Sequence, residues 1–67
     1  MEHSCYHVIS DQNTKHFPII EDAKKMASDW KNNGDSNIRV FKITATEDAD
    51  RIFIDEKLIP TIEIFSN

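Results

Sequence analysis

Three side chains near the start of the chain are of types that bind metals or act as nucleophiles. His3, Cys5 and His7 alternate along the sequence, so an extended strand would direct all three to one face. Imidazole and thiolate are good zinc or copper ligands, and His16 could approach them across a hairpin. An imidazole beside Cys5 could also activate it as a nucleophile. A metal- or thiol-based site on this strand is therefore one hypothesis.

The surroundings of these residues favour a simpler interpretation. The ligand spacings of structural zinc sites are absent, and the apolar neighbours Tyr6 and Val8 are typical of a strand that buries Cys5 as a small core residue. The chain has one glycine, so no glycine-rich turn offers an anion hole. We expect no catalytic residue, no metal ligand and no cofactor, and we expect a protein that is not an enzyme.

A second cluster of chemically capable groups is acidic. Glu47, Asp48 and Asp50 crowd one short stretch, and carboxylates at this density can bind a cation or attract a basic protein. A calcium loop needs an obligatory glycine, and this stretch has none. A solvated loop is the simplest interpretation, and contact with a basic protein surface is the alternative.

The charge balance limits the classes of partner. The chain of 67 residues has 8 Lys and Arg against 12 Asp and Glu, a formal net charge of −4. This balance opposes strong binding to nucleic-acid phosphates, which requires a basic patch. A small nucleic-acid-binding module remains an alternative, with cations that could share a surface: Lys15, Lys24, Lys25, Lys31, Arg39 and Lys42.

Length and cysteine content predict one domain over residues 1–67, because the chain is near the lower limit for an independent core. One cysteine excludes an internal disulfide framework and points to a reducing compartment. The chain shows neither a signal-peptide pattern nor an apolar run long enough to span a bilayer. We expect a cytoplasmic protein without membrane contact.

One segment, Ile19–Lys31, has a sustained helical period. Pro18 suits the first turn of a helix, and Gly34 can take the left-handed conformation that ends one. No residue immediately before Ile19 is a good N-cap. The apolar stripe of this helix comprises Ile19, Ala23, Met26, Ala27 and Trp30.

The other apolar segments have the alternation of strands. We predict strands at Cys5–Ile9, Asn37–Ala45, Arg51–Leu58 and Ile59–Phe65, with a short return strand near His16 and Phe17. The acidic stretch Thr46–Asp50 is either a hairpin loop or the start of a second helix.

These elements predict an α+β domain of order β-α-β-β(-β), with a mostly antiparallel sheet and one helix on one face. The alternative order is β-α-β-α-β. Apolar residues stand on both faces of the predicted strands, and one helix covers only one face. The second face therefore either lies under a second helix or meets another chain.

The favoured function is a non-enzymatic, acidic protein-binding module, a regulator or inhibitor of the type that phages and mobile elements encode. It could first form a homodimer through the open sheet face or an edge strand. Phe53, Ile59 and Phe65 would supply the apolar contacts. Glu47, Asp48 and Asp50 would steer a partner with a basic surface.

Overall fold

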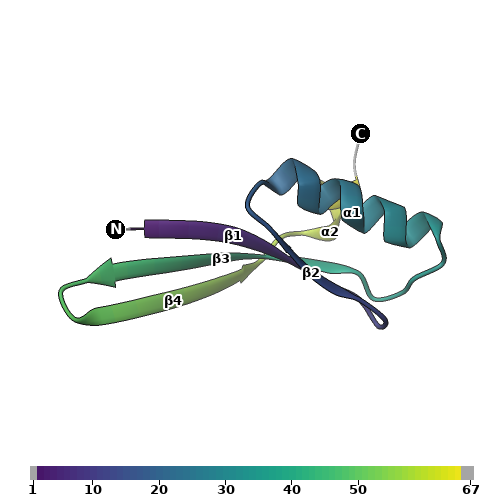
Figure 1. Cartoon of the computed structure of the whole chain (residues 1–67). Helices are drawn as coiled ribbons and strands as arrows, with labels where there is room; N and C mark the ends of the chain where they lie inside the picture. Colours follow the sequence, from purple (N-terminus) through teal and green to yellow (C-terminus); the bar gives the residue numbers. More distant parts are fainter. Residues whose placement is uncertain (1, 66–67) are drawn as a thin grey trace.

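A computed structural model of the chain describes residues 2–65 and has six elements (Figure 1). Met1, Ser66 and Asn67, which the sequence analysis includes in the single domain, lie outside the described residues. The elements are the strands β1 (Glu2–Ile9) and β2 (Thr14–Phe17), the helix α1 (Ile20–Asn32), the strands β3 (Arg39–Asp48) and β4 (Arg51–Leu58), and the short helix α2 (Thr61–Phe65).

The four strands form one antiparallel sheet in the order β2-β1-β3-β4. The α+β class is therefore confirmed. The first predicted strand lies inside the sheet, as its two apolar faces indicate, and Val8 at its end stands opposite Val40 of β3. The short return strand after the first turn is also present, with His16 opposite His7.

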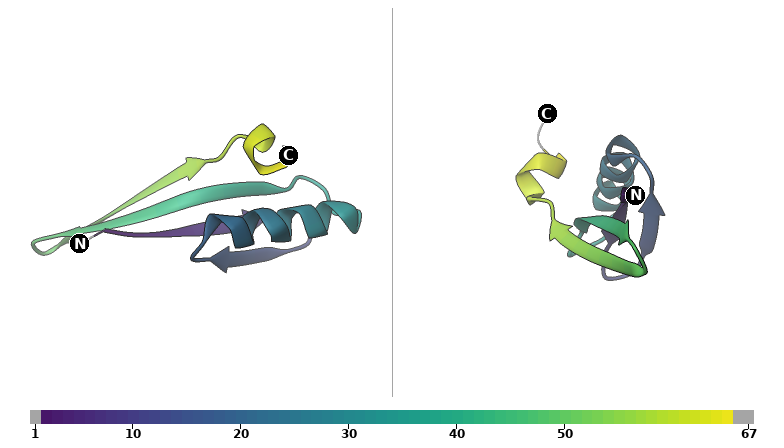
Figure 2. Two further views of the ribbon diagram at one scale, coloured as in Figure 1. Left: turned by 90° about the horizontal axis from the view of Figure 1, so that it is seen from above. Right: turned by 90° about the vertical axis from the view of Figure 1, so that its left-hand side faces the viewer.

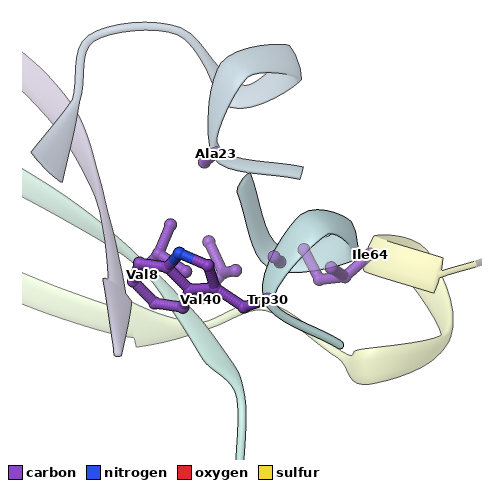
Figure 3. Close-up of a cluster of buried hydrophobic side chains, with 6 residues drawn as sticks. Val8, Ala23, Trp30, Val40 and Ile64 are labelled. Carbon is purple, nitrogen blue, oxygen red and sulfur yellow. The ribbon is translucent and has the colours of Figure 1, made fainter. Parts of the chain in front are cut away.

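Both helices pack on the same side of the sheet, over one end of it (Figure 2). Val8 and Val40 point to that side and are almost completely buried. They meet the indole of Trp30, the side chains of Ala23 and Ala27 from α1, and Ile64 from α2 (Figure 3). These six residues are the buried hydrophobic core among the described residues.

The predicted helix forms with small changes at its start. Ile19 has an extended backbone and caps α1 without a side-chain hydrogen bond, as the poor N-cap sequence indicates. Its side chain is 53% exposed, so its predicted place in the apolar stripe is wrong, because the chain reaches helical geometry only at Ile20. Gly34 has a φ of 88°, the left-handed conformation expected beyond the helix end.

The predicted final strand at Ile59–Phe65 is wrong, because Thr61–Phe65 forms helix α2. The backbone N–H of Ile59 donates to the carbonyl of Val40 at 2.9 Å, and Pro60 then has no N–H with which to continue a ladder. Helical spacing directs Ile64 into the core and leaves Ile62 74% exposed.

The acidic stretch between β3 and β4 closes a hairpin. Asp48 pairs with Arg51, so the turn is only Ala49 and Asp50, and Ala49 has a positive φ of 54°. The predicted loop was longer, since Thr46 belongs to β3. A helix at this position, and with it the order β-α-β-α-β, is wrong.

A polar network joins the turn after β1 to the loop after α1. The hydroxyl of Ser10, which is 8% exposed, donates to the carboxylate of Asp35, and Asn13 donates to the same oxygen at 3.0 Å. The Ser10 oxygen also accepts the backbone N–H of Asn13 at 2.9 Å. The Ser10 hydrogen bond is the main cause that lowers the pKa of Asp35.

The molecule is elongated, with extents of 44 × 25 × 16 Å. Its Cα radius of gyration is 13.1 Å, whereas a compact domain of this length would have about 11 Å. Strands β1, β3 and β4 run on beyond the helices (Figure 1). We call this part the arm, residues 2–5 and 43–56, and we call the rest of the described chain the base.

Candidate functional site

The sheet has one face that neither helix covers, which we call the open face. Val8 and Val40 point toward the helices, and successive side chains of a strand alternate between faces. The strand register therefore assigns every other residue to the opposite side. The apolar residues on the open face are Cys5, Ile9, Phe41, Ile43, Ala45, Ile52, Ile54 and Leu58.

Apolar contact along the open face is continuous across strands. Ile43 stands opposite Cys5 on one side, Ala45 opposite Ile54 on the other, and Phe41 opposite Leu58. Ile52 and Ile54 are 69% and 73% exposed. A contiguous, exposed apolar surface of this kind is typical of a protein interaction site.

Strand β4 is the most exposed element of the fold, because all eight of its residues are exposed. It lies at the edge of the sheet, and β3 is the single element of the described chain that it contacts. No helix among residues 2–65 packs on either of its faces. The arm therefore presents the open face, the outer edge of β4 and, beyond the helices, the uncovered helix side around Phe53.

The histidines predicted to share a side with Cys5 do lie on the open face. His7 and His16 pair across β1 and β2, and their rings stack with centroids 4.0 Å apart. Burial is the main cause that lowers the pKa of His7, the nearby His16 lowers it further, and Glu56 opposes both. The Nε2 atom of His7 is buried without a hydrogen-bond partner among the described residues.

These side chains do not assemble into a metal site. Within the described part of the chain, no three His, Cys, Asp or Glu side chains converge on one point. Cys5 is half-buried in the middle of β1. The arrangement is a stacked imidazole pair at the base end of the open face.

Half of the twelve acidic residues of the sequence lie in the arm. Glu47 and Asp48 end β3 and Asp50 lies in the turn, so all three stand at the tip. Glu2, Asp55 and Glu56 are also in the arm, which thus has six carboxylates against the single cation Arg51. The arm concentrates negative charge beyond the average for the chain.

The three predicted apolar contact residues do not share one surface. Phe53 stands opposite Thr46 on the helix side of the sheet, beyond the helices, and is 53% exposed. Ile59 and Phe65 pack against the core, and the Lys31 ammonium lies 4.4 Å from the Phe65 ring centroid. Two of the three therefore serve the base rather than a free surface.

Sequence reasoning missed the residues that make the open face apolar at the arm. The sequence predicts strands at Ile43, Ile52 and Ile54, but their common side depends on the register between β3 and β4. A two-residue turn at Ala49 and Asp50 would have fixed that register. The sequence signal for such a turn was weak, because neither residue is glycine or asparagine.

The cations considered for nucleic-acid binding are divided between surfaces. Arg39 lies on the open face, whereas Lys15 and Lys42 lie on the helix side of the sheet. Lys24, Lys25 and Lys31 belong to α1. The sheet thus separates Arg39 from the other five, because α1 also lies on the helix side, and the six cations do not share one surface.

Comparisons with family models, with curated proteins and with solved structures found no match to this chain. Among the described residues, neither helix has the length and apolar character needed to cross a membrane.

Proposed function

We propose that this chain is a non-enzymatic protein-binding module, a cytoplasmic regulator or inhibitor, and that the open face is its binding surface. The observation that carries the proposal is the placement of both helices on one side of the sheet. The other side retains a contiguous apolar row centred on Ile43, Ala45 and Ile54. Burying such a row against a second protein gives association its hydrophobic driving force.

Charge indicates what kind of protein fits this surface. The arm has six carboxylates and one arginine, so its field attracts a basic surface and repels an acidic one. Glu47 and Glu56 stand among the apolar residues of the open face, and Asp48 and Asp50 lie at its end. The partner is therefore a protein with an apolar patch and a basic rim, whose association is faster at low salt.

Affinity capture from the native host tests this function. The protein with Ile43→Lys has a charge in the middle of the open face, and the matched control Ile62→Lys changes an isoleucine that is 74% exposed on α2. We expect one host protein to be retained by the unchanged chain and by the control, and to be lost with Ile43→Lys. Titration with that purified protein should weaken as salt rises.

Circular dichroism of each variant shows whether the fold is kept. The proposal is contradicted if the folded Ile43→Lys protein binds the captured partner as tightly as the unchanged chain. It is equally contradicted if the Ile62→Lys control loses binding to the same extent, because the surface would then be elsewhere.

A further inference from the structure

The two edges of the sheet are protected to different degrees. On one side, the four residues of β2 cover Tyr6–Ile9 of β1 and end at Phe17, directly before Pro18. The edge then continues as Glu2–Cys5 of β1, whose first residue is charged. The β4 edge has eight residues, all exposed, and its segment Ile52–Ile54 contains no charge, proline or glycine. Natural sheets rarely leave such an edge open, because it is a template for pairing with another strand.

The strand register shows which backbone groups of β4 face outward. Asp48 pairs with Arg51 across the two-residue turn, and Ile59 donates its N–H to Val40. Hydrogen-bonded pairs alternate along an antiparallel ladder, so the odd-numbered residues of β4 bond to β3. The N–H and C=O groups of Ile52 and Ile54 therefore point away from β3, toward the open edge.

A second copy of this chain can use those groups in one self-complementary register. A two-fold axis perpendicular to the sheet places the open faces of both copies on the same side. Even-numbered residues of one β4 therefore pair with even-numbered residues of the other, and odd-numbered residues with odd-numbered ones. With the axis at Phe53, the two Phe53 side chains meet. Ile52 then pairs with Ile54 of the second copy, and Arg51 with Asp55 of the second copy.

Neighbouring registers lose this complementarity. An axis at Ile54 would place Phe53 opposite Asp55 and Arg51 opposite Lys57. An axis at Asp55 would place the two Asp55 carboxylates against each other. Like charges directly opposite are destabilising, whereas aromatic, apolar and opposite-charge pairs stabilise a sheet.

We propose that two copies of the chain pair antiparallel along β4, centred on Phe53, and form one continuous eight-stranded sheet. This inference deepens the proposed function and rests on it in one respect, since the pairing joins two open faces into one longer surface. Ile52 and Ile54 of both copies meet at its centre. A dimer can thus offer a partner twice the apolar area that one copy offers.

The interface is small, since the paired segment is Arg51–Asp55 in each copy. Its size belongs to the class of weak complexes, so the dimer forms reversibly. Asp50 comes near Glu56 of the second copy, and both arms are acidic. Salt screens this repulsion, so self-association should strengthen as salt rises, whereas binding of a basic partner should weaken.

Sedimentation velocity of the full chain over a range of concentrations tests the dimer. We expect the mass to rise toward twice that of one chain as concentration increases. Arg51→Asp and Asp55→Arg should each remain monomeric, because each places two like-charged pairs in the interface. An equimolar mixture of the two variants should recover the doubled mass, since every pair is then of opposite charge.

Lys57→Glu is the matched control, because Lys57 lies on the same strand and face as Asp55 but outside the paired segment. Its dimer should persist. A chain that stays monomeric at all concentrations overturns the proposal, and so does a dimer that the single charge reversals leave unchanged.

A disulfide tests the register directly. In a Cys5→Ser background, Phe53→Cys places two thiols opposite each other on the two-fold axis, at a Cα separation that a disulfide accepts. In the same background, Lys57→Cys places its two thiols about 26 Å apart. Each thiol lies four residues from the axis, and a strand rises about 3.3 Å per residue. Oxidation should cross-link the first and not the second, and the reverse result or equal cross-linking would contradict the pairing.

The same variants separate this inference from the proposed function. Ile43 lies on β3, away from the β4 edge, so Ile43→Lys should abolish partner binding and keep the dimer. If Ile43→Lys also abolishes the dimer, two copies meet through their open faces and the edge pairing is wrong. If the chain is monomeric but still captures its partner, only the dimer is overturned.

Discussion

The base and the arm of this molecule are stabilised in different ways. All six buried hydrophobic residues of the described chain lie in the base, where two helices cover Val8 and Val40. The arm has none, and it is held by the ladders of β1 with β3 and of β3 with β4. The base therefore stabilises the fold, and the arm extends it into solvent.

The difference also separates stability from interaction. A buried apolar side chain of the base, such as Val8 or Val40, has already lost its contact with water, so it cannot bury further surface against a partner. Ile52 and Ile54 in the arm keep about 70% of their surface exposed and can still bury it. Exposed apolar residues on such a strand are typical of a protein that binds another protein there.

The largest expected effect is the loss of folding stability when the core of the base is disrupted. Trp30→Ala removes the largest side chain of the core and should lower the free energy of unfolding by about 3–5 kcal/mol. A single core of this size is expected to supply only about 3–5 kcal/mol, so the variant should be largely unfolded. Thermal melting followed by circular dichroism checks this, and a cooperative melt near that of the unchanged chain would contradict it.

The polar network at the end of the base gives a smaller effect. Ser10→Ala removes the hydroxyl that bonds Asp35 and the turn after β1, and it should cost about 1 kcal/mol in urea unfolding. The pKa of Asp35 should rise toward its ordinary value. Ser36 contributes only its backbone N–H to Asp35, so Ser36→Ala should change neither quantity.

The arm should tolerate a change that the base does not. Ile54→Thr replaces an exposed side chain and should alter the stability of the dilute monomer by less than about 0.5 kcal/mol. Val40→Thr places the same hydroxyl in the core, where burial without a partner costs about 1–3 kcal/mol. Equal losses in the two variants, measured by urea unfolding, would remove the distinction between base and arm.

The stacked histidines give the smallest and most local effect, a change in the pKa of one side chain, His7. The pKa of His7 in the folded state lies below its ordinary value of 6.5. As the pH falls through 6.5, His7 therefore takes up a proton in the unfolded chain before it does so in the folded chain. The stability contribution of neutral His7 is therefore complete above pH 6.5 and is lost as the pH falls through its folded-state pKa. NMR titration should show this low pKa, and His16→Gln should raise it in part, because burial remains.

Much of the base could be predicted from the sequence, because its signals are local. The period of Ala23, Ala27 and Trp30 predicts the buried side of α1, and Gly34 predicts its end. Local alternation also predicts the strand Arg51–Leu58, which lies mostly in the arm, with the bounds that β4 has. Each of these depends on residues a few positions apart, where helical and strand geometry alone determine which side chains share a face.

The candidate interface could be predicted less well, because its signals are not local. Phe53 and Ile54 are neighbours in sequence but lie on opposite faces, and their roles depend on the register with β3. Ile64 is buried in a cluster whose other members, such as Trp30, are far away in the chain. The sequence by itself determined the α+β class, the long helix and the acidic character of the chain. Only the tertiary structure decided that both helices share one side of the sheet, because that choice depends on packing between segments that no local pattern connects.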